Sequence, residues 1–177
     1  TGPTAINLVA NTYTVVSTDS EGCTAEQTVV ISEPSAVTAT TQQADLLCDG
    51  DSNGTATVNP AGGVGNFTFL WCNSNTTAMA TGLPSGPCSV TVTDGNGCSI
   101  IETVTIIEPN PLSVSVTGTD ITCFGEMNGT ATATVNGGTG SLGYAWCNSQ
   151  STETATGLDV GTCCVIVTDG NGCTAED

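Results

Sequence analysis

Hydrophobic and polar residues alternate along much of the chain. In residues 112–117, leucine and valine alternate with serine and threonine, and residues 90–93 and 103–106 show the same alternation. A period of two places successive side chains on opposite faces of a strand, so these runs predict half-buried β-strands. No stretch has the apolar period of a helix. The pattern therefore predicts an all-β protein.

Glycine-rich turn signals separate the alternating runs, at Asn53-Gly54, Gly62-Gly63 and Asn128-Gly129. The segment Asp94-Gly95-Asn96-Gly97 lies between two alternating runs, which indicates a hairpin connection. We expect Asp94 to cap this hairpin, and Asp169 to cap its counterpart. Six or seven short strands in about 75 residues predict a small Ig-like or fibronectin-like β-sandwich.

The chain repeats itself with a period of 75 residues. Cys23, Cys98 and Cys173 are separated by this interval, and residues 35–102 align with 110–177 without a gap, with 30 identities in 68 positions. We therefore divide the chain into unit one (1–34, the C-terminal half of a repeat), unit two (35–109, a complete repeat) and unit three (110–177, nearly complete). We expect this to be a piece of a longer tandem array.

The charge of the chain excludes many functions. Its 177 residues include 17 Asp and Glu but no Lys, Arg or His, which gives a net charge of −17. Nucleic-acid and anionic-membrane binding need cations, and catalysis by histidine or lysine needs those side chains. The acidic residues that recur between units lie in turns, so we predict no enzyme. No apolar run approaches the ~20 residues of a membrane span, so no membrane insertion is expected.

Several motifs recur in order in the two larger units. Cys-x-Gly-x-x-Asn-Gly-Thr-Ala-Thr occupies 48–57 and 123–132, and a tryptophan follows in each unit. A Val-x-Val-Thr-Asp-Gly-Asn-Gly-Cys hairpin comes next, and unit two closes with Ile-x-Glu-Pro. This pattern resembles the SprB repeat of the surface adhesins of gliding Bacteroidetes. The resemblance implies an extracellular filament that is attached to the outer membrane, exported by type IX secretion and moved by the gliding machinery.

Ten cysteines indicate an oxidising compartment and structural disulfides. The resemblance implies that Cys48 pairs with Cys98, and Cys123 with Cys173. A second bridge is suggested by the joint occurrence of two further cysteines in each unit, Cys72 with Cys88 and Cys147 with Cys163. Simple strand alternation cannot satisfy both kinds of bridge, so either one strand breaks alternation or one pairing crosses a repeat junction. We predict pairing within each unit, which leaves Cys23 and Cys164 unpaired.

Three candidate binding features have structural alternatives. Trp71 and Trp146 suit either a sugar-stacking platform or a sandwich core, and we predict core. Asp49, Asp51 and Asn53 resemble the start of a calcium loop, but Pro60 stands where the bidentate glutamate belongs. We therefore predict no cofactor, with calcium as an alternative. The run Thr130-Ala131-Thr132-Ala133-Thr134 raises the further alternative of an ice-binding surface.

These observations predict a structural and adhesive segment of a long filament, built as an acidic rod stapled by disulfides. Its expected partner is an extracellular surface or polysaccharide. A carbohydrate- or calcium-dependent binding module remains an alternative.

Overall fold

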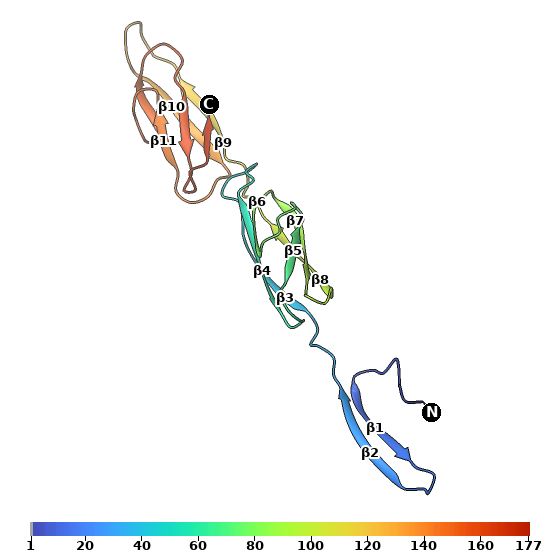
Figure 1. The fold of residues 1–177 in the computed structure, drawn as a ribbon. Coiled ribbons are helices and arrows are strands. Elements are labelled where there is room, and N and C mark those ends of the chain that lie inside the picture. Colours follow the sequence, from blue (N-terminus) through green and yellow to red (C-terminus); the bar gives the residue numbers. More distant parts are fainter. Residues whose placement is uncertain (1) are drawn as a thin grey trace.

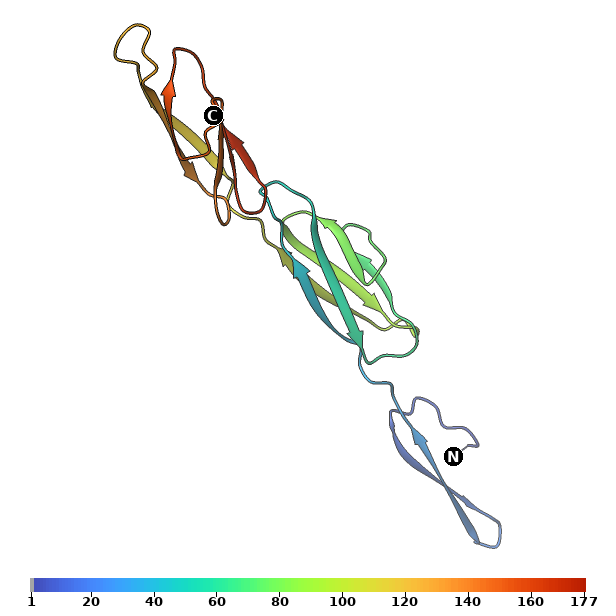
Figure 2. The ribbon, with the colours of Figure 1, turned by 90° about the vertical axis from the view of Figure 1, so that its left-hand side faces the viewer.

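The computed structural model describes residues 2–177, and within them every regular element is a β-strand. The predicted all-β fold of β-sandwich repeats is confirmed. Figures 1 and 2 show three units that follow one another end to end in an extended molecule, with the two termini far apart. No helix in the described residues is long and apolar enough to cross a membrane.

Unit two is a sandwich of two three-stranded antiparallel sheets, in the orders β3-β4-β6 and β5-β7-β8. Its strands are β3 (Thr38–Ala44), β4 (Gly54–Ala61), β5 (Thr68–Trp71), β6 (Met79–Leu83), β7 (Gly86–Thr93) and β8 (Ser99–Ile106).

Unit three repeats this topology, with sheets in the orders β9-β10-β12 and β11-β13-β14. Its strands are β9 (Ser113–Thr119), β10 (Gly129–Asn136), β11 (Gly143–Trp146), β12 (Thr154–Leu158), β13 (Val165–Thr168) and β14 (Thr174–Glu176). Unit one is a hairpin of β1 (Asn11–Thr18) and β2 (Thr24–Ile31), whose side chains are mostly exposed.

Strands β5 and β6 run in the same direction, which breaks the alternation of the other strands. A hydrogen bond from the Val64 N–H to the Asp94 carboxylate joins the segment after β4 to the end of β7, so β4 and β7 point to the same end of the sandwich. Because β6 is antiparallel to β4 and β5 is antiparallel to β7, β5 and β6 share the opposite direction. The chain crosses from one sheet to the other between them.

The core of unit two lies between its sheets and follows the alternation of the sequence. On β7, Cys88, Val90 and Val92 are buried, while the intervening residues are more exposed. The largest fully buried side chains of this unit are Val58, Leu83, Val90, Val92 and Ile106. Unit three has an equivalent core around Trp146, Val165 and Val167.

Candidate functional site at the repeat junction

The junction between units two and three is closed by a disulfide between Cys48 and Cys173, which we call the staple. Cys48 lies in the loop between β3 and β4, and Cys173 lies in the hairpin between β13 and β14. Their Cα atoms are 5.6 Å apart, within the normal range for a disulfide. The predicted pairs Cys48–Cys98 and Cys123–Cys173 are therefore wrong, because Cys98 and Cys123 are exposed free thiols.

Strand direction explains why Cys48 cannot reach Cys98. The Leu46 N–H donates to the Ile107 carbonyl, which places the β3–β4 loop at the end of the sandwich where β8 finishes. The hairpin that holds Cys98 lies at the other end, where β8 begins. A strand of eight residues is about 25 Å long, whereas a disulfide needs Cα atoms about 4.4–6.8 Å apart. Cys48 therefore meets the hairpin of the following unit.

Three hydrogen bonds strengthen the junction around the staple. The Asn171 amide donates to the Leu47 carbonyl across the junction at 3.0 Å. On the unit-two side, the Ile107 N–H donates to Asp45 at 3.0 Å, and the Gly50 N–H donates to the Glu108 carboxylate at 3.3 Å. The linker between the sandwiches is thus held against the same loop that carries Cys48. A hollow of about 390 Å³ lies beside the staple and is lined by Cys48, Asp49, Pro111, Leu112, Gly172, Cys173 and Thr174.

Asp169 fixes the conformation of the hairpin that presents Cys173. One carboxylate oxygen accepts the N–H groups of Asn171 and Cys173, each at 2.9 Å, and the other accepts the Thr139 N–H at 2.7 Å. Burial raises the pKa of Asp169, but hydrogen bonds from Thr139, Cys173 and Asn171 outweigh it, so the pKa lies below its usual value. The ionised carboxylate therefore positions one half of the staple.

Asp94 makes the equivalent contacts in unit two, and the predicted cap is confirmed. It accepts the N–H groups of Asn96 at 2.9 Å and Cys98 at 2.8 Å, besides that of Val64 at 2.9 Å. The hydrogen bond from Val64 is the main cause that lowers the pKa of Asp94, and those from Cys98 and Asn96 add to it against the opposing effect of burial. The two hairpins are thus built alike.

The other two disulfides lie within single units, Cys72–Cys88 and Cys147–Cys163, each with Cα atoms 5.4 Å apart. The Cys72 N–H donates to the Ser89 carbonyl, which extends the pairing of β5 with β7 by one residue. The bridge therefore ties the point where the chain leaves one sheet to the neighbouring strand. Cys23 and Cys164 are exposed free thiols.

The two tryptophans lie inside the sandwiches. Trp71 is 2% exposed and Trp146 is 4% exposed. Each indole N–H donates to a backbone carbonyl, of Thr77 at 2.9 Å and of Thr152 at 2.8 Å. A sugar that stacks on an indole needs an open ring face, and neither ring offers one.

The residues considered for calcium do not form a ring of oxygen ligands. The Asn53 amide nitrogen donates to the Asp51 carboxylate at 3.0 Å, so this side chain directs a donor toward its neighbour. In unit three, the Asn128 amide likewise donates to Glu126 at 2.7 Å. Residues 2–177 contain no group of three acidic, cysteine or histidine side chains arranged to hold a metal.

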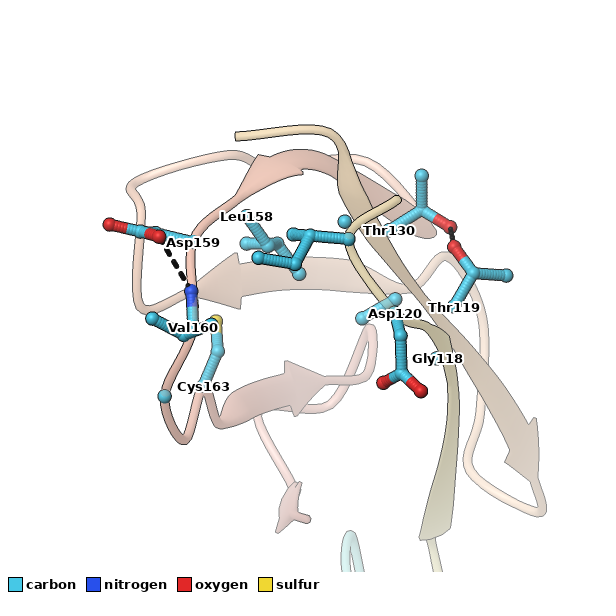
Figure 3. Close-up of a pocket in the computed structure, with 12 residues that line it drawn as sticks. Gly118, Thr119, Asp120, Thr130, Leu158, Asp159, Val160 and Cys163 are labelled. Carbon is cyan, nitrogen blue, oxygen red and sulfur yellow. Dashed lines mark hydrogen bonds between the residues drawn. The ribbon is translucent and has the colours of Figure 1, made fainter. Parts of the chain in front are cut away.

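A hollow of about 560 Å³ lies in unit three, where β9 and β12 end and β10 begins (Figure 3). Leu158, Asp159, Val160 and Cys163 line one side of it, and Thr119 and Asp120 line the other. Gly129 also lines it, and the equivalent residue in unit two is Gly54. A Cβ on Gly54 would lie 2.8 Å from Ile106. The hollow is thus the space that β8 fills in unit two, since β14 has only three residues.

Comparison with known protein families identifies the repeat. The family model of the SprB repeat matches residues 40–76 and residues 115–151, two segments that begin 75 residues apart. The chain thus contains two segments that match the SprB repeat. The SprB repeat is a structural repeat of cell-surface proteins, so the chain is a repeat segment of that kind. No curated protein matches the chain.

The matched segments of the SprB repeats contain the loop half of the staple but not the hairpin half. Cys48 lies within 40–76, whereas Cys173 lies outside 115–151. Sequence reasoning also missed Asn171, which bonds across the junction. The recurrence of Asn-Gly-Cys in the hairpins of units two and three was the available signal.

Proposed function

We propose that the chain is a structural and adhesive segment of a long cell-surface filament, in which the staple makes successive SprB repeats into a stiff acidic rod. The Cys48–Cys173 bond carries this proposal, because it joins two sandwiches that the chain already connects through residues 107–112. Domains joined by one linker normally move relative to one another. A second covalent connection restricts both bending and rotation at the junction.

The staple also gives tension a path that bypasses all strands of the two sandwiches except β3 and β14. A force applied along the chain reaches Cys48, crosses the S–S bond to Cys173 and leaves through β14. Strands β4 to β13 lie inside the closed loop and carry none of this load. A filament dragged over a surface gains from this arrangement, because its repeats keep their fold under shear.

The uniform negative charge also helps to keep the rod extended. All 17 ionisable acidic side chains repel one another, and the chain has no cationic side chain to pair with them. Such repulsion opposes collapse and self-association. It acts over about 8–10 Å at moderate salt, which spans a junction between neighbouring units.

The family resemblance supports the cellular setting of the proposal. The rod spaces or presents a binding region away from an outer-membrane attachment, and its partner is an extracellular surface or polysaccharide. Export by type IX secretion and movement by the gliding machinery belong to this proposal. We assign the chain no catalytic role.

Small-angle scattering tests the rod. The oxidised chain should show a larger maximum dimension than the Cys48→Ser/Cys173→Ser variant, whose junction can bend. The matched control Cys164→Ser removes an exposed thiol away from the junction and should scatter like the parent. Raising salt should shorten the unstapled variant more than the stapled chain. Identical curves for parent and double variant would refute the stiffening role.

A threonine array in unit three favours an ice-binding face as a second candidate function. The strand pairing places Thr130 between Thr119 and Thr156, and Thr132 between Thr117 and Thr154. Threonines within one row are therefore about 4.8 Å apart across the strands, and the two rows lie about 6.7 Å apart along the strands. Some hydroxyls bond to each other, as Thr132 does to Thr154 at 3.0 Å, which reduces their capacity to order water.

An ice-recrystallisation assay separates this candidate from a spacer. If the array binds ice, Thr132→Lys should abolish inhibition of crystal growth, while Thr57→Lys, at the equivalent position of unit two, should retain it. Unimpeded growth with the parent chain would exclude the candidate.

A further inference from the structure

The hairpin and loop positions that form the staple occur again in the chain, at Cys98 and Cys123. With the 75-residue offset, Cys123 corresponds to Cys48 and Cys98 corresponds to Cys173. We propose that Cys123 and Cys98 form the same inter-repeat disulfide with adjoining SprB repeats, so that one staple closes every junction of an array. This inference rests on the staple of the proposed function.

The hairpin that holds Cys98 is already in the bonding conformation. Asp94-Gly95-Asn96-Gly97-Cys98 has the same sequence as the stapled hairpin at 169–173. The Cys98 N–H donates to Asp94 at 2.8 Å, and the Cys173 N–H donates to Asp169 at 2.9 Å. Cys98 is exposed, and it lies at the end of unit two that faces the preceding unit. It therefore needs a loop cysteine from a repeat docked at that end.

The loop that holds Cys123 has the same turn as the stapled loop. The Glu126 N–H donates to the Cys123 carbonyl at 3.1 Å, as the Asp51 N–H donates to the Cys48 carbonyl at 3.4 Å. The glycine two residues after each cysteine has a positive φ, 84° in unit three and 75° in unit two. Cys123 is exposed at the far end of unit three, where the loop before β10 projects away from unit two (Figure 1).

Unit one supports the pattern with a third copy of the hairpin. The Cys23 N–H donates to Asp19 at 2.9 Å, and Cys23 is an exposed free thiol. Cys164 differs from these residues, since serine (Ser89) occupies its place in unit two and it lies on neither a β3–β4-type loop nor a capped hairpin. It serves as an internal control.

Formation of the bond needs an oxidant that accepts two electrons, here a disulfide such as oxidised glutathione. The Cys123 thiolate attacks this disulfide and releases one glutathione thiolate, which leaves a mixed disulfide. The hairpin cysteine thiolate of the adjoining repeat then attacks the Cys123 sulfur and displaces the second glutathione. Two protein thiols become one disulfide, and their two protons and two electrons end on two glutathione thiols.

The test extends the full chain by one period. A second copy of residues 103–177 is fused after Asp177, which supplies the end of a β8-type strand, a linker and another sandwich. The copy carries Cys123→Ser, so that its own loop cannot compete, and Thr174→Ser, which marks its hairpin peptide by mass. After refolding in a glutathione buffer, free thiols are alkylated. Because the chain has no Lys or Arg, a protease that cuts at acidic residues replaces trypsin.

We expect the peptide 121–126 to be linked to the marked hairpin peptide in most molecules, with Cys164 alkylated. An alkylated Cys123 beside an intact Cys48–Cys173 bond would overturn this inference and leave the staple of the proposed function standing. Loss of both bonds would overturn both.

A second measurement needs no added repeat. The unaltered chain, oxidised at high concentration, should give dimers in which Cys123 of one chain is linked to Cys23 or Cys98 of another. Cys123→Ser should abolish these dimers, and Cys164→Ser should retain them. Dimers linked mainly through Cys164 would count against the inference.

Discussion

Replacing Cys48 and Cys173 together by serine should destabilise units two and three at once, although the substitutions remove only one bond. In the parent, when unit two unfolds beside a folded unit three, both ends of its chain stay tethered to unit three. The closed segment runs from Cys48 to the start of unit three, roughly 60 residues, and closing such a loop lowers the entropy of the unfolded chain by about 4 kcal/mol at 25 °C. The same argument holds for unit three.

This loss is large for domains of this size. A domain of about 75 residues has a total stability of roughly 4–11 kcal/mol, so the double variant loses much of its margin. At a urea slope near 2 kcal/mol per M, the unfolding midpoint should fall by about 2 M. Removing the Cys72–Cys88 bridge, which closes a loop of 16 residues, should cost about 3 kcal/mol in unit two and leave unit three unchanged.

Tryptophan fluorescence follows each unit separately. Trp71 is buried in unit two and Trp146 in unit three, so Trp146→Phe and Trp71→Phe backgrounds each report one unit. The double serine variant should shift both midpoints, whereas Cys164→Ser should shift neither. Unchanged midpoints in the double variant would refute the reasoning, and so would a shift confined to one unit.

Three further outcomes follow from the contacts above. Because the pKa of Asp169 is lower in the folded state, its stabilising effect is complete above about pH 4 and is lost as pH falls through the folded pKa. Asp169→Asn should therefore weaken unit three at pH 7, and denaturation at a series of pH values should show the stability difference between parent and variant disappearing in acid. Leu83→Ala should cost about 2–5 kcal/mol, and Leu158→Ala less, because Leu83 is fully buried whereas Leu158 borders the open hollow; equal midpoint shifts would contradict this. Titration calorimetry with calcium should show no binding heat, and a heat abolished by Asp51→Asn would contradict the assignment of that loop to a plain turn.

The fold could be predicted from the sequence because each unit encodes it locally. Alternation at Val90 and Val92 marks a strand with one apolar face, and both side chains are buried. The hairpin followed from the Asp94-Gly95-Asn96-Gly97 segment, whose aspartate needs only neighbouring N–H groups to form the cap. Such features depend on a few adjacent residues, so the sequence is sufficient.

The disulfide pairing depended on information that no local pattern contains. Cys48 has two hairpin cysteines as candidates, Cys98 and Cys173, one period apart, and strand direction alone decides between them. That direction depends on the crossing between β5 and β6, where residues 72–78 pass from one sheet to the other. Nothing in their composition marks this passage. The sequence left two solutions open, a strand that breaks alternation and a pairing that crosses a repeat junction. The structure has both, because β5 and β6 run in the same direction and the staple crosses the junction.

Pulling a single chain by its two ends tests the stapled rod most directly. The staple encloses a sequence separation of 125 residues, which corresponds to roughly 410–450 Å of extended chain at ~3.3–3.6 Å per residue. In the oxidised chain, this length should stay locked while residues outside 48–173 extend, and reduction should release it as additional extension. Release of most of this length from the oxidised chain, without reduction, would contradict the account, since the two disulfides within units two and three can hold back only 16 residues each.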